Sequence, residues 1–386
     1  MQSNDGREVV FITDQVALDE ACESWFKLPA LALDTEFVRT NTFYPKLGLL
    51  QLADDSNCYL IDPLEIQSWT RFVKVLLNPE CEIVMHSGGE DLTVLLTSLG
   101  AVPARFFDTQ MASAYAGLGF SLSYQALVQT VTGKELPKDQ TRSDWLKRPL
   151  TDLQLEYAAN DVCYLLPLYK GLTERLEQRG FLEYLRQDAV LQVENSVSLE
   201  QPAHWAKIYT GVSSAWKLKK KSLACLQALC VWREEVARSR NRPRNWIAKD
   251  NELYALASLS ESGQTITISD LRSNDELSKE LVRKQGESLL NIVNAERDAS
   301  RSSPTTVDPP LSPRMRSTVK AFREAVLQRA DEMDIAPELL ARKKHLTAVA
   351  LGVERNGKPG WPADMAGWRR GVLERDFDDI VAGLKA

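Results

Sequence analysis

The chain has 386 residues, more than a single hydrophobic core usually serves, so two or three domains are expected. Hydrophobic residues make up 44% and charged residues 26%, as in soluble globular proteins, and no apolar run approaches the roughly 18 residues that span a bilayer. Six cysteines without a CxxC pair and only three histidines lack the spacing of a zinc site or a disulfide framework, which predicts buried free thiols.

The net charge of −6 hides a difference between the two halves of the chain. Residues 1–200 contain 16 Lys and Arg against 29 Asp and Glu, whereas residues 201–386 contain 31 against 24. The basic excess is concentrated in residues 207–249, with 11 basic residues and two acidic ones. Such a concentration is expected where phosphates are bound, so the two halves are predicted to have different tasks.

The first part of the chain alternates between strand-like and helical patterns. Residues 1–14 lack a basic stretch followed by an apolar core, so they do not indicate a secretory signal, and a cytoplasmic location is predicted. The polar residues 54–57 between two apolar runs indicate a hairpin turn, so some neighbouring strands should be antiparallel. Leucines at helical spacing then lead to Gly100, which suits a helix end. The apolar runs predict strands of a mixed α/β sheet at residues 9–13, 31–37, 49–53, 58–62 and 83–86.

Beyond about residue 200 the strand signal fades and the apolar spacing is helical, so this half is predicted to be all-α. Residues 300–313 are rich in Ser and Pro, which disfavours regular structure and marks a boundary between two helical modules. The predicted organisation is a first domain over 1–200, a helical domain over 210–299, the linker 300–313, and a second helical domain over 314–386.

Two carboxylates share one face of the strand LALDTEF. Side chains alternate along a strand, so Asp34 and Glu36 project together. Unpaired negative charge in so apolar a run is costly, and a bound divalent cation would remove that cost. For this pair alone, a solvated strand end is an equally good interpretation.

Two further candidate positions with acidic residues follow later in the chain. Tyr157 and Asp161 are four residues apart in a predicted helix, so a phenol and a carboxylate can address the same point in space. Asp91 follows a Ser-Gly-Gly turn and opens another helix. An acid at that position usually only complements the helix dipole, and the adjacent Glu90 is the alternative acid.

The order DxE, Asp, YxxxD resembles the DEDD exonuclease superfamily, in the subgroup whose last motif carries tyrosine. Residues 44–55 and 143–165 are similar to the ribonuclease D family, and residues 222–257 resemble the HRDC domain, a small helical nucleic-acid-binding module. Residues 315–386 look like a second, divergent copy. The resemblance implies an α/β mixed-sheet, ribonuclease H-like exonuclease domain followed by two small all-α HRDC-type domains.

The same resemblance implies a mechanism. Two divalent metal ions, Mg²⁺ or Mn²⁺, would be held by Asp34, Glu36, Asp91 and Asp161, and Tyr157 would orient the attacking water. A phenol is a poor general base at neutral pH, which is consistent with an orienting role. The implied partner is RNA with a free 3′ end, tRNA precursors above all, from which nucleoside 5′-monophosphates would be released one at a time.

Basic residues are the candidates for contact with the RNA backbone, because phosphate binding needs charge more than precise geometry. For those before the third motif, a solvated loop is an equally good interpretation. Trp145 is expected to anchor that loop, and the tryptophans among the later basic residues are expected to be core residues. The candidates are Lys138, Arg142, Arg148, Lys219, Lys220, Arg240, Arg242 and Arg244.

Two other functions remain open from the sequence. A DNA 3′→5′ exonuclease of the same superfamily would use the same metal chemistry, and discrimination requires contacts with the 2′-hydroxyl that a sequence does not reveal. A non-catalytic RNA-binding scaffold would be expected to have replaced at least one acid, whereas all four acids and the tyrosine are present. No obligate protein partner is indicated, and a monomer is predicted.

Overall fold

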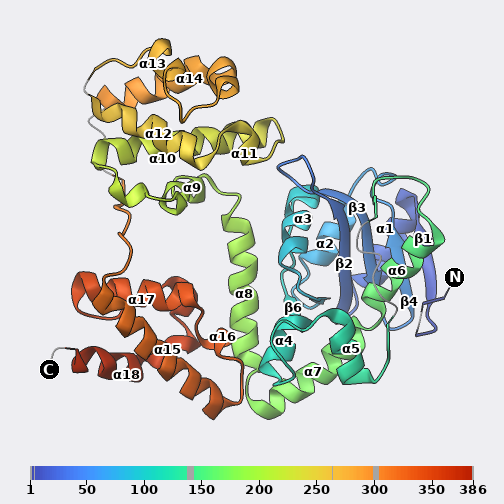
Figure 1. Ribbon diagram of the computed structural model, residues 1–386. Helices are drawn as coiled ribbons and strands as arrows, with labels where there is room; N and C mark the ends of the chain where they lie inside the picture. The colour runs from blue at the N-terminus through green and yellow to red at the C-terminus, as the bar shows by residue number, and fades with distance from the viewer. Residues whose placement is uncertain (1, 4, 137–142, 263, 299–303, 385–386) are drawn as a thin grey trace. The chain divides into compact units, whose positions relative to one another are not determined.

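The computed structural model describes residues 2–3, 5–136, 143–262, 264–298 and 304–384. The chain divides into two compact units that do not follow its linear order (Figure 1). The first unit combines Met1–Val38, Pro45–Val197 and Leu311–Ala386, and the second combines Arg39–Tyr44 with Ser198–Pro310.

The first unit is built on a mixed sheet with the strand order β1-β4-β3-β2-β5-β6. β2 pairs antiparallel with β3 and parallel with β5, and β3 pairs antiparallel with β4, as the predicted hairpin requires. The mixed α/β sheet is therefore confirmed, and β6 is the strand that the sequence did not predict. The strands are β1 Glu8–Ile12, β2 Ala30–Val38, β3 Lys46–Ala53, β4 Asn57–Ile61, β5 Glu82–Met85 and β6 Phe106–Asp108.

Local sequence explains the turns on either side of these strands. Asp54 accepts hydrogen bonds from the backbone N–H groups of Ser56 and Asn57, both at 2.7 Å, which closes the turn between β3 and β4. Gly100 ends α3 in the left-handed conformation, with φ of 78°, as its position predicts. Asp108 caps α4 by accepting from the N–H groups of Gln110 and Met111.

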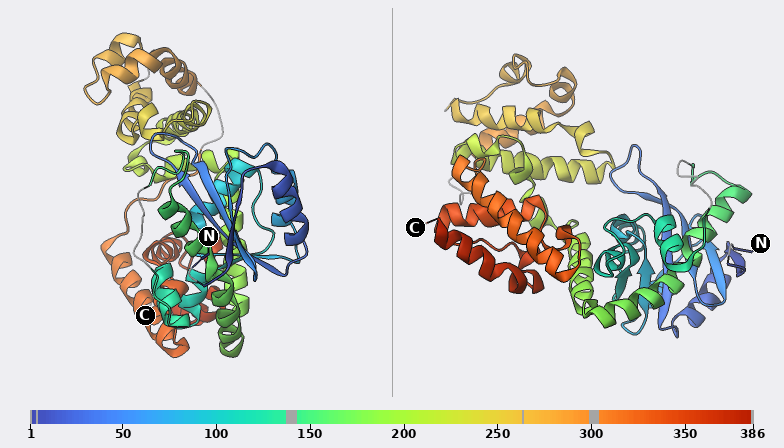
Figure 2. Two further views of the ribbon diagram at one scale, coloured as in Figure 1. Left: turned by 90° about the vertical axis from the view of Figure 1, so that its right-hand side faces the viewer. Right: turned by 60° about the horizontal axis from the view of Figure 1, so that its bottom comes forward.

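Helices cover both faces of the sheet (Figure 2). On one face α1 Gln15–Trp25, α2 Thr70–Leu76 and α3 Gly89–Leu99 pack against Leu31 and Leu33 of β2. The other face carries Ala32 and Leu49, and its helices are α4 Thr109–Tyr115, α5 Tyr124–Thr132, α6 Asp152–Cys163 and α7 Leu165–Arg179. β2 is thus buried from both sides, and its carboxylates lie on the face of α6.

α8 and the helices from the end of the chain complete the first unit. The carboxylate of Asp188 in α8 accepts from Nη2 of Arg369 and from the hydroxyl of Tyr115, both at 2.6 Å. Trp368 stacks on Tyr184 at 4.5 Å between ring centroids, so the contact is apolar as well as ionic. The helices are α8 Leu182–Ser198, α15 Pro313–Met333, α16 Pro337–Leu340, α17 Lys343–Asn356 and α18 Trp368–Gly383, with a 3₁₀ turn at Ala363–Met365.

The regular elements described in the second unit are all helices, as predicted. The side chain of Asn241 accepts from the N–H groups of Phe43 and Tyr44, both at 2.9 Å, and the guanidinium of Arg238 lies 4.6 Å from the ring of Phe43. Its helices are α9 Pro202–Trp205, α10 Lys220–Ser239, α11 Arg244–Ile247, α12 Asp250–Leu259, α13 Ile268–Arg272 and α14 Lys279–Asp298, with 3₁₀ turns at Ile208–Gly211, Ala215–Lys217 and Ser260–Ser262.

Two predicted absences can be compared with the structure. All six cysteines are free and buried, which confirms the expectation of buried thiols. Across the described ranges, no helix combines the length and the apolar composition that a bilayer crossing requires.

Candidate active site

β2 supplies the first two acids of the site. Leu33 and Thr35 are buried toward α3, whereas Asp34 and Glu36 alternate onto the opposite face and are only partly covered. β5 pairs with β2 only along Ala30–Ala32, so the carboxyl half of β2 extends beyond the end of its parallel neighbour. The two carboxylates therefore lie near the start of α3, the helix that follows β5.

That helix, α3, brings the third acid to the end of β2. Asp91 lies in its first turn with 8% of its surface exposed, and the hydroxyl of Thr35 donates to its Oδ1 atom. The turn before the helix is fixed because Asp108 accepts from the N–H of Gly88 at 3.1 Å, and a side chain at Gly88 would collide with Met85. Glu90 is exposed, so Asp91 is the acid that reaches the cluster.

α6 carries the tyrosine and the fourth acid. The helix begins at a capping box in which Thr151 and Gln154 bond each other's backbone N–H. Trp145 is buried, and its ring centroid lies 6.1 Å from that of Tyr157. The expectation that Trp145 anchors its loop against α6 is confirmed, and this packing orients the tyrosine toward the acids.

Electrostatics shows that the four acids form one cluster. Burial, followed by repulsion from Asp91, Asp161 and Glu36, holds the pKa of Asp34 well above its usual range. Burial, then Asp161 and Asp91, raises the pKa of Glu36 to about 8. Burial also raises the pKa of Asp91 to about 6, and none of the main influences on these three carboxyl groups comes from a lysine or arginine of the described residues. Mutual repulsion among the carboxylates therefore favours their protonated forms in the absence of a cation.

Tyr157 belongs to the same cluster. Burial, followed by the charges of Asp161 and Glu36, raises the pKa of its phenol, and a hydrogen bond to Asp161 raises it further. The phenol consequently stays protonated at neutral pH. It can orient a water molecule, but it cannot act as a base there.

The donor set fits hard divalent cations, which prefer carboxylate oxygens, and a cation would relieve the mutual repulsion of the acids. The side chains are not drawn together into a finished coordination shell. Within the described ranges, no three His, Cys, Asp or Glu side chains are close enough to hold an ion as they stand. The fit therefore rests on the kind and charge of the donors.

Of the three basic residues predicted to contact phosphates before α6, only one lies within the described residues. Lys138 and Arg142 lie outside the described residues. Arg148 donates to Asp62 with two nitrogens and to the carbonyls of Trp145, Lys147 and Gly48, the last at 2.7 Å. All five of its N–H donors are used inside the protein, so the expected phosphate contact is corrected to a structural role.

The basic residues of the second unit are mostly at its surface. Lys219, Lys220, Arg240 and Arg242 are exposed, although Lys219 pairs with Glu261 at 3.2 Å. Arg244 donates twice to the buried carboxylate of Glu234, once at 2.8 Å, which reduces its capacity to bind a phosphate.

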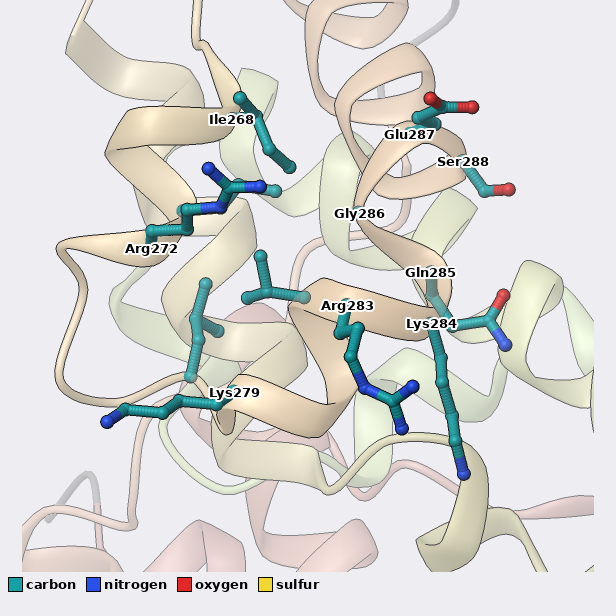
Figure 3. Close-up of a pocket in the computed structure, with 12 residues that line it drawn as sticks. Ile268, Arg272, Lys279, Arg283, Lys284, Gln285, Gly286, Glu287 and Ser288 are labelled. Carbon is teal, nitrogen blue, oxygen red and sulfur yellow. The ribbon is translucent and has the colours of Figure 1, made fainter.

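Two hollows in the second unit gather further basic residues that the sequence did not single out. One, of about 590 Å³, is lined by Arg240, Arg242, Trp246, Lys249 and Lys284 among others. The second, of about 800 Å³, shares Lys284 and adds Arg272, Lys279 and Arg283 (Figure 3). Lys279, Arg283 and Lys284 lie on α14, and spacing did not single them out because charged residues also cover the ordinary solvent face of a helix.

Two of the tryptophans among the basic residues, Trp216 and Trp246, are not the core residues that were expected. Trp232 packs against the core as predicted, but Trp246 is 62% exposed and Trp216 is 40% exposed. The guanidinium of Arg242 lies 5.8 Å from the ring centroid of Trp246. A short helix of four residues carries Trp246, which leaves its ring little of the unit to pack against.

The chain is similar to known nucleases along almost its whole length. Residues 9–177 match the family described as 3'-5' exonuclease, and residues 222–293 match the HRDC domain. Ribonuclease D of Pseudomonas paraeruginosa is 38% identical over 364 residues, which cover 94% of this chain and 95% of that protein. Ribonuclease D of Escherichia coli is 34% identical over 377 residues, covering 96% and 97%. The crystal structure of Escherichia coli RNase D, an exoribonuclease involved in structured RNA processing, matches 97% of this chain and 99% of its own, with a TM-score of 0.87 and 31% identity.

Proposed function

The chain belongs to the ribonuclease D family and is a 3′→5′ exoribonuclease, and we propose that it shortens the 3′ ends of structured RNA, tRNA precursors included. The proposed products are nucleoside 5′-monophosphates. The observation that carries the proposal is the convergence of Asp34, Glu36, Asp91 and Asp161, in which repulsion from the other three acids raises the pKa of Asp34 and repulsion from Asp161 and Asp91 raises that of Glu36.

We propose that these four carboxylates hold two divalent ions, Mg²⁺ or Mn²⁺. When bound, two such ions would lower the pKa of the attacking water and neutralise charge at both the attacking and the leaving oxygen. The protein's part is to fix the carboxylates. Asp34 and Glu36 are fixed by the strand, Asp91 by its hydrogen bond from Thr35, and Asp161 by α6.

Tyr157 is proposed to position the attacking water. Its hydroxyl proton is engaged with Asp161, so its oxygen is available to accept a hydrogen bond. This interaction would aim a lone pair of the water at the terminal phosphodiester. Geometry of this kind is worth a large rate factor because the reacting atoms no longer search for one another.

The second unit is proposed to contact the RNA backbone. Lys219, Lys220, Arg240 and Arg242 remain candidates, and the hollow that contains Arg240 and Arg242 also presents Lys249, Lys284 and the exposed ring of Trp246. Charge of this kind binds phosphates, and an exposed indole offers a face on which a base can stack. We keep Arg244 as a weaker candidate because of its bonds to Glu234.

The last helices are proposed to be a second, divergent HRDC-like domain. α10 and α15 are long helices, and each is followed by a four-residue helix that ends at an extended alanine, Ala248 or Ala341. In both places the next residue caps a further helix, α12 or α17. This shared order of elements supports the proposal. We also propose a monomer and a cytoplasmic location.

Removing charge from the first hollow tests the RNA contact. Lys249→Gln with Lys284→Gln is expected to weaken RNA binding and to lower the slope of log affinity against log salt by about 0.7 for each phosphate that the variant no longer neutralises. The measurement is fluorescence anisotropy of a labelled single-stranded RNA over a salt series. Lys170→Gln removes an exposed lysine of α7 instead and should leave the slope unchanged. An equal slope for all three proteins would argue against the hollow.

Point variants are preferable to deletion of the helical half. Residues 311–386 belong to the first unit, and Phe322 and Phe377 share a hydrophobic cluster with residues of α7. A truncation that removed them would expose this core and confound loss of RNA binding with loss of folding.

The proposed reaction is tested with a 3′-extended tRNA and a matched single-stranded DNA, each with Mg²⁺, with Mn²⁺ and with chelator. The expected result is metal-dependent release of 5′-monophosphates from the RNA, which Asp34→Ala abolishes. Shortening of the DNA alone would instead support a DNA exonuclease. RNA binding without release would support a non-catalytic scaffold.

A further inference from the structure

Gln51 in β3 is a buried polar residue without a hydrogen-bond partner. Its exposed surface is 0%, and neither its Oε1 nor its Nε2 atom bonds another described group. Buried amides are normally satisfied, and one left unsatisfied destabilises the folded state. An apolar residue would avoid that cost, so the amide at this position requires a reason.

The register of the sheet places Gln51 beside the acidic cluster. It is directly opposite Asp34 in the antiparallel pair of β2 and β3, and opposite Leu60 of β4 on its other side. Residues opposite each other project from the same face with Cβ atoms about 4.5–5.5 Å apart. Leu49, which shares this face, packs with Trp145 and with Ala158 of α6. Gln51 therefore lies under the helix that carries Tyr157 and Asp161.

We propose that Gln51 is a positioning residue for the metal site, and that its side-chain NH₂ group donates a hydrogen bond to the carboxylate of Asp34 when that carboxylate holds an ion. This inference rests on the proposed role of Asp34 as a ligand. Ligating carboxylates are commonly held by a hydrogen bond from a neighbouring side chain, which fixes the oxygen that faces the metal.

The chemistry of an amide suits this position better than that of the alternatives. A lysine or arginine would also hold Asp34, but its charge would compete with the cation for the carboxylate. A leucine would pack well and would leave the carboxylate free to rotate. The amide donates a proton without adding charge, so the cluster keeps the negative charge that attracts divalent ions.

The decisive experiment compares metal affinity with stability in the full-length chain. Gln51→Leu is expected to raise the dissociation constant for Mn²⁺, measured by calorimetric titration, about 10–100-fold. The same variant should keep or increase the resistance of the ion-free protein to urea, because it removes an unsatisfied group. A structural role alone would lower resistance to urea and leave Mn²⁺ affinity unchanged, which would overturn the proposal.

Three further variants separate the possible explanations. Thr173→Val in α7 removes another buried, unpartnered polar atom; it should leave Mn²⁺ affinity unchanged and, like Gln51→Leu, keep or increase resistance to urea. Gln51→Met keeps the length of the side chain without its donor, so it should weaken Mn²⁺ binding as Gln51→Leu does; wild-type affinity in it would overturn the proposal. Asp34→Asn should weaken binding by itself. If Asp34→Asn binds Mn²⁺ with wild-type affinity, both the proposed metal site and the proposed role of Gln51 are wrong. If Asp34→Asn binds weakly but the Gln51 variants bind with wild-type affinity, only the proposed role of Gln51 is wrong.

Discussion

Asp161→Asn is expected to lose both Mn²⁺ binding and RNA hydrolysis, whereas Tyr157→Phe is expected to lose hydrolysis alone. The amide of asparagine removes one of the negative charges that the cluster offers to a cation. Metal ions contribute several kcal/mol of charge stabilisation in the transition state, so the rate should fall on the order of 10³-fold. Phenylalanine removes only the hydroxyl that is proposed to orient water, and a loss of about 10²-fold is expected.

The measurement pairs single-turnover release of 5′-monophosphates with calorimetric titration of Mn²⁺. Matched controls lie nearby: Asp152→Asn changes an exposed acid in the first turn of α6, and Tyr169→Phe changes a tyrosine of α7 whose ring packs on Phe107. Both controls should retain activity and affinity. Equal Mn²⁺ affinity in the wild type and in Asp161→Asn would remove Asp161 from the ligand set.

Mn²⁺ is expected to raise the melting temperature more at about pH 8 than at about pH 6. The folded protein holds the pKa of Glu36 near 8 and that of Asp91 near 6, above their ordinary values of 4.5 and 3.8. Between the ordinary and the raised values the folded state binds more protons than the unfolded state. The ion-free protein therefore loses stability as the pH rises through this window.

Ion binding has the opposite dependence on pH. A cation binds the ionised carboxylates, so its affinity increases as protons leave Glu36 and Asp91. The stabilisation by Mn²⁺ should consequently grow over the range in which the ion-free protein weakens. Differential scanning fluorimetry at both pH values, with Mn²⁺ or with chelator, measures the difference. Asp55→Asn alters only an exposed acid and should preserve it, whereas the same shift at both pH values would contradict the account.

Short-range pattern was sufficient to place much of the candidate site. Alternation along β2 placed Asp34 and Glu36 on one face, and the helical spacing of Tyr157 and Asp161 needed no tertiary information. The choice of Asp91 over Glu90 is supported by burial, which depends on how α3 meets the sheet. These features were predictable because the chemistry lies on regular elements.

Long-range pairing explains what the sequence did not reveal. Arg148 was a candidate for phosphate contact, but its partner Asp62 is far away in the chain. Gln51 was not singled out, because its position opposite Asp34 depends on strand register. Trp246 was expected to be a core residue, but it lies on a four-residue helix without buried residues and is exposed. The strand β6 has only three residues, too few for an alternating pattern.

The division of the first unit between the two ends of the chain affects how the protein is made. Residues 311–386 are synthesised after the other segments of this unit, and the aromatic pair of Phe322 and Phe377 contributes to the same cluster as residues of α7. At about 5–20 residues per second, the earlier part of this unit waits several seconds or more for its remaining helices. A nascent chain that stalls before its last helices would expose an incomplete core, which is the kind of surface that chaperones and proteases bind. The core of the nuclease unit is therefore complete only after residues 311–386 have been synthesised.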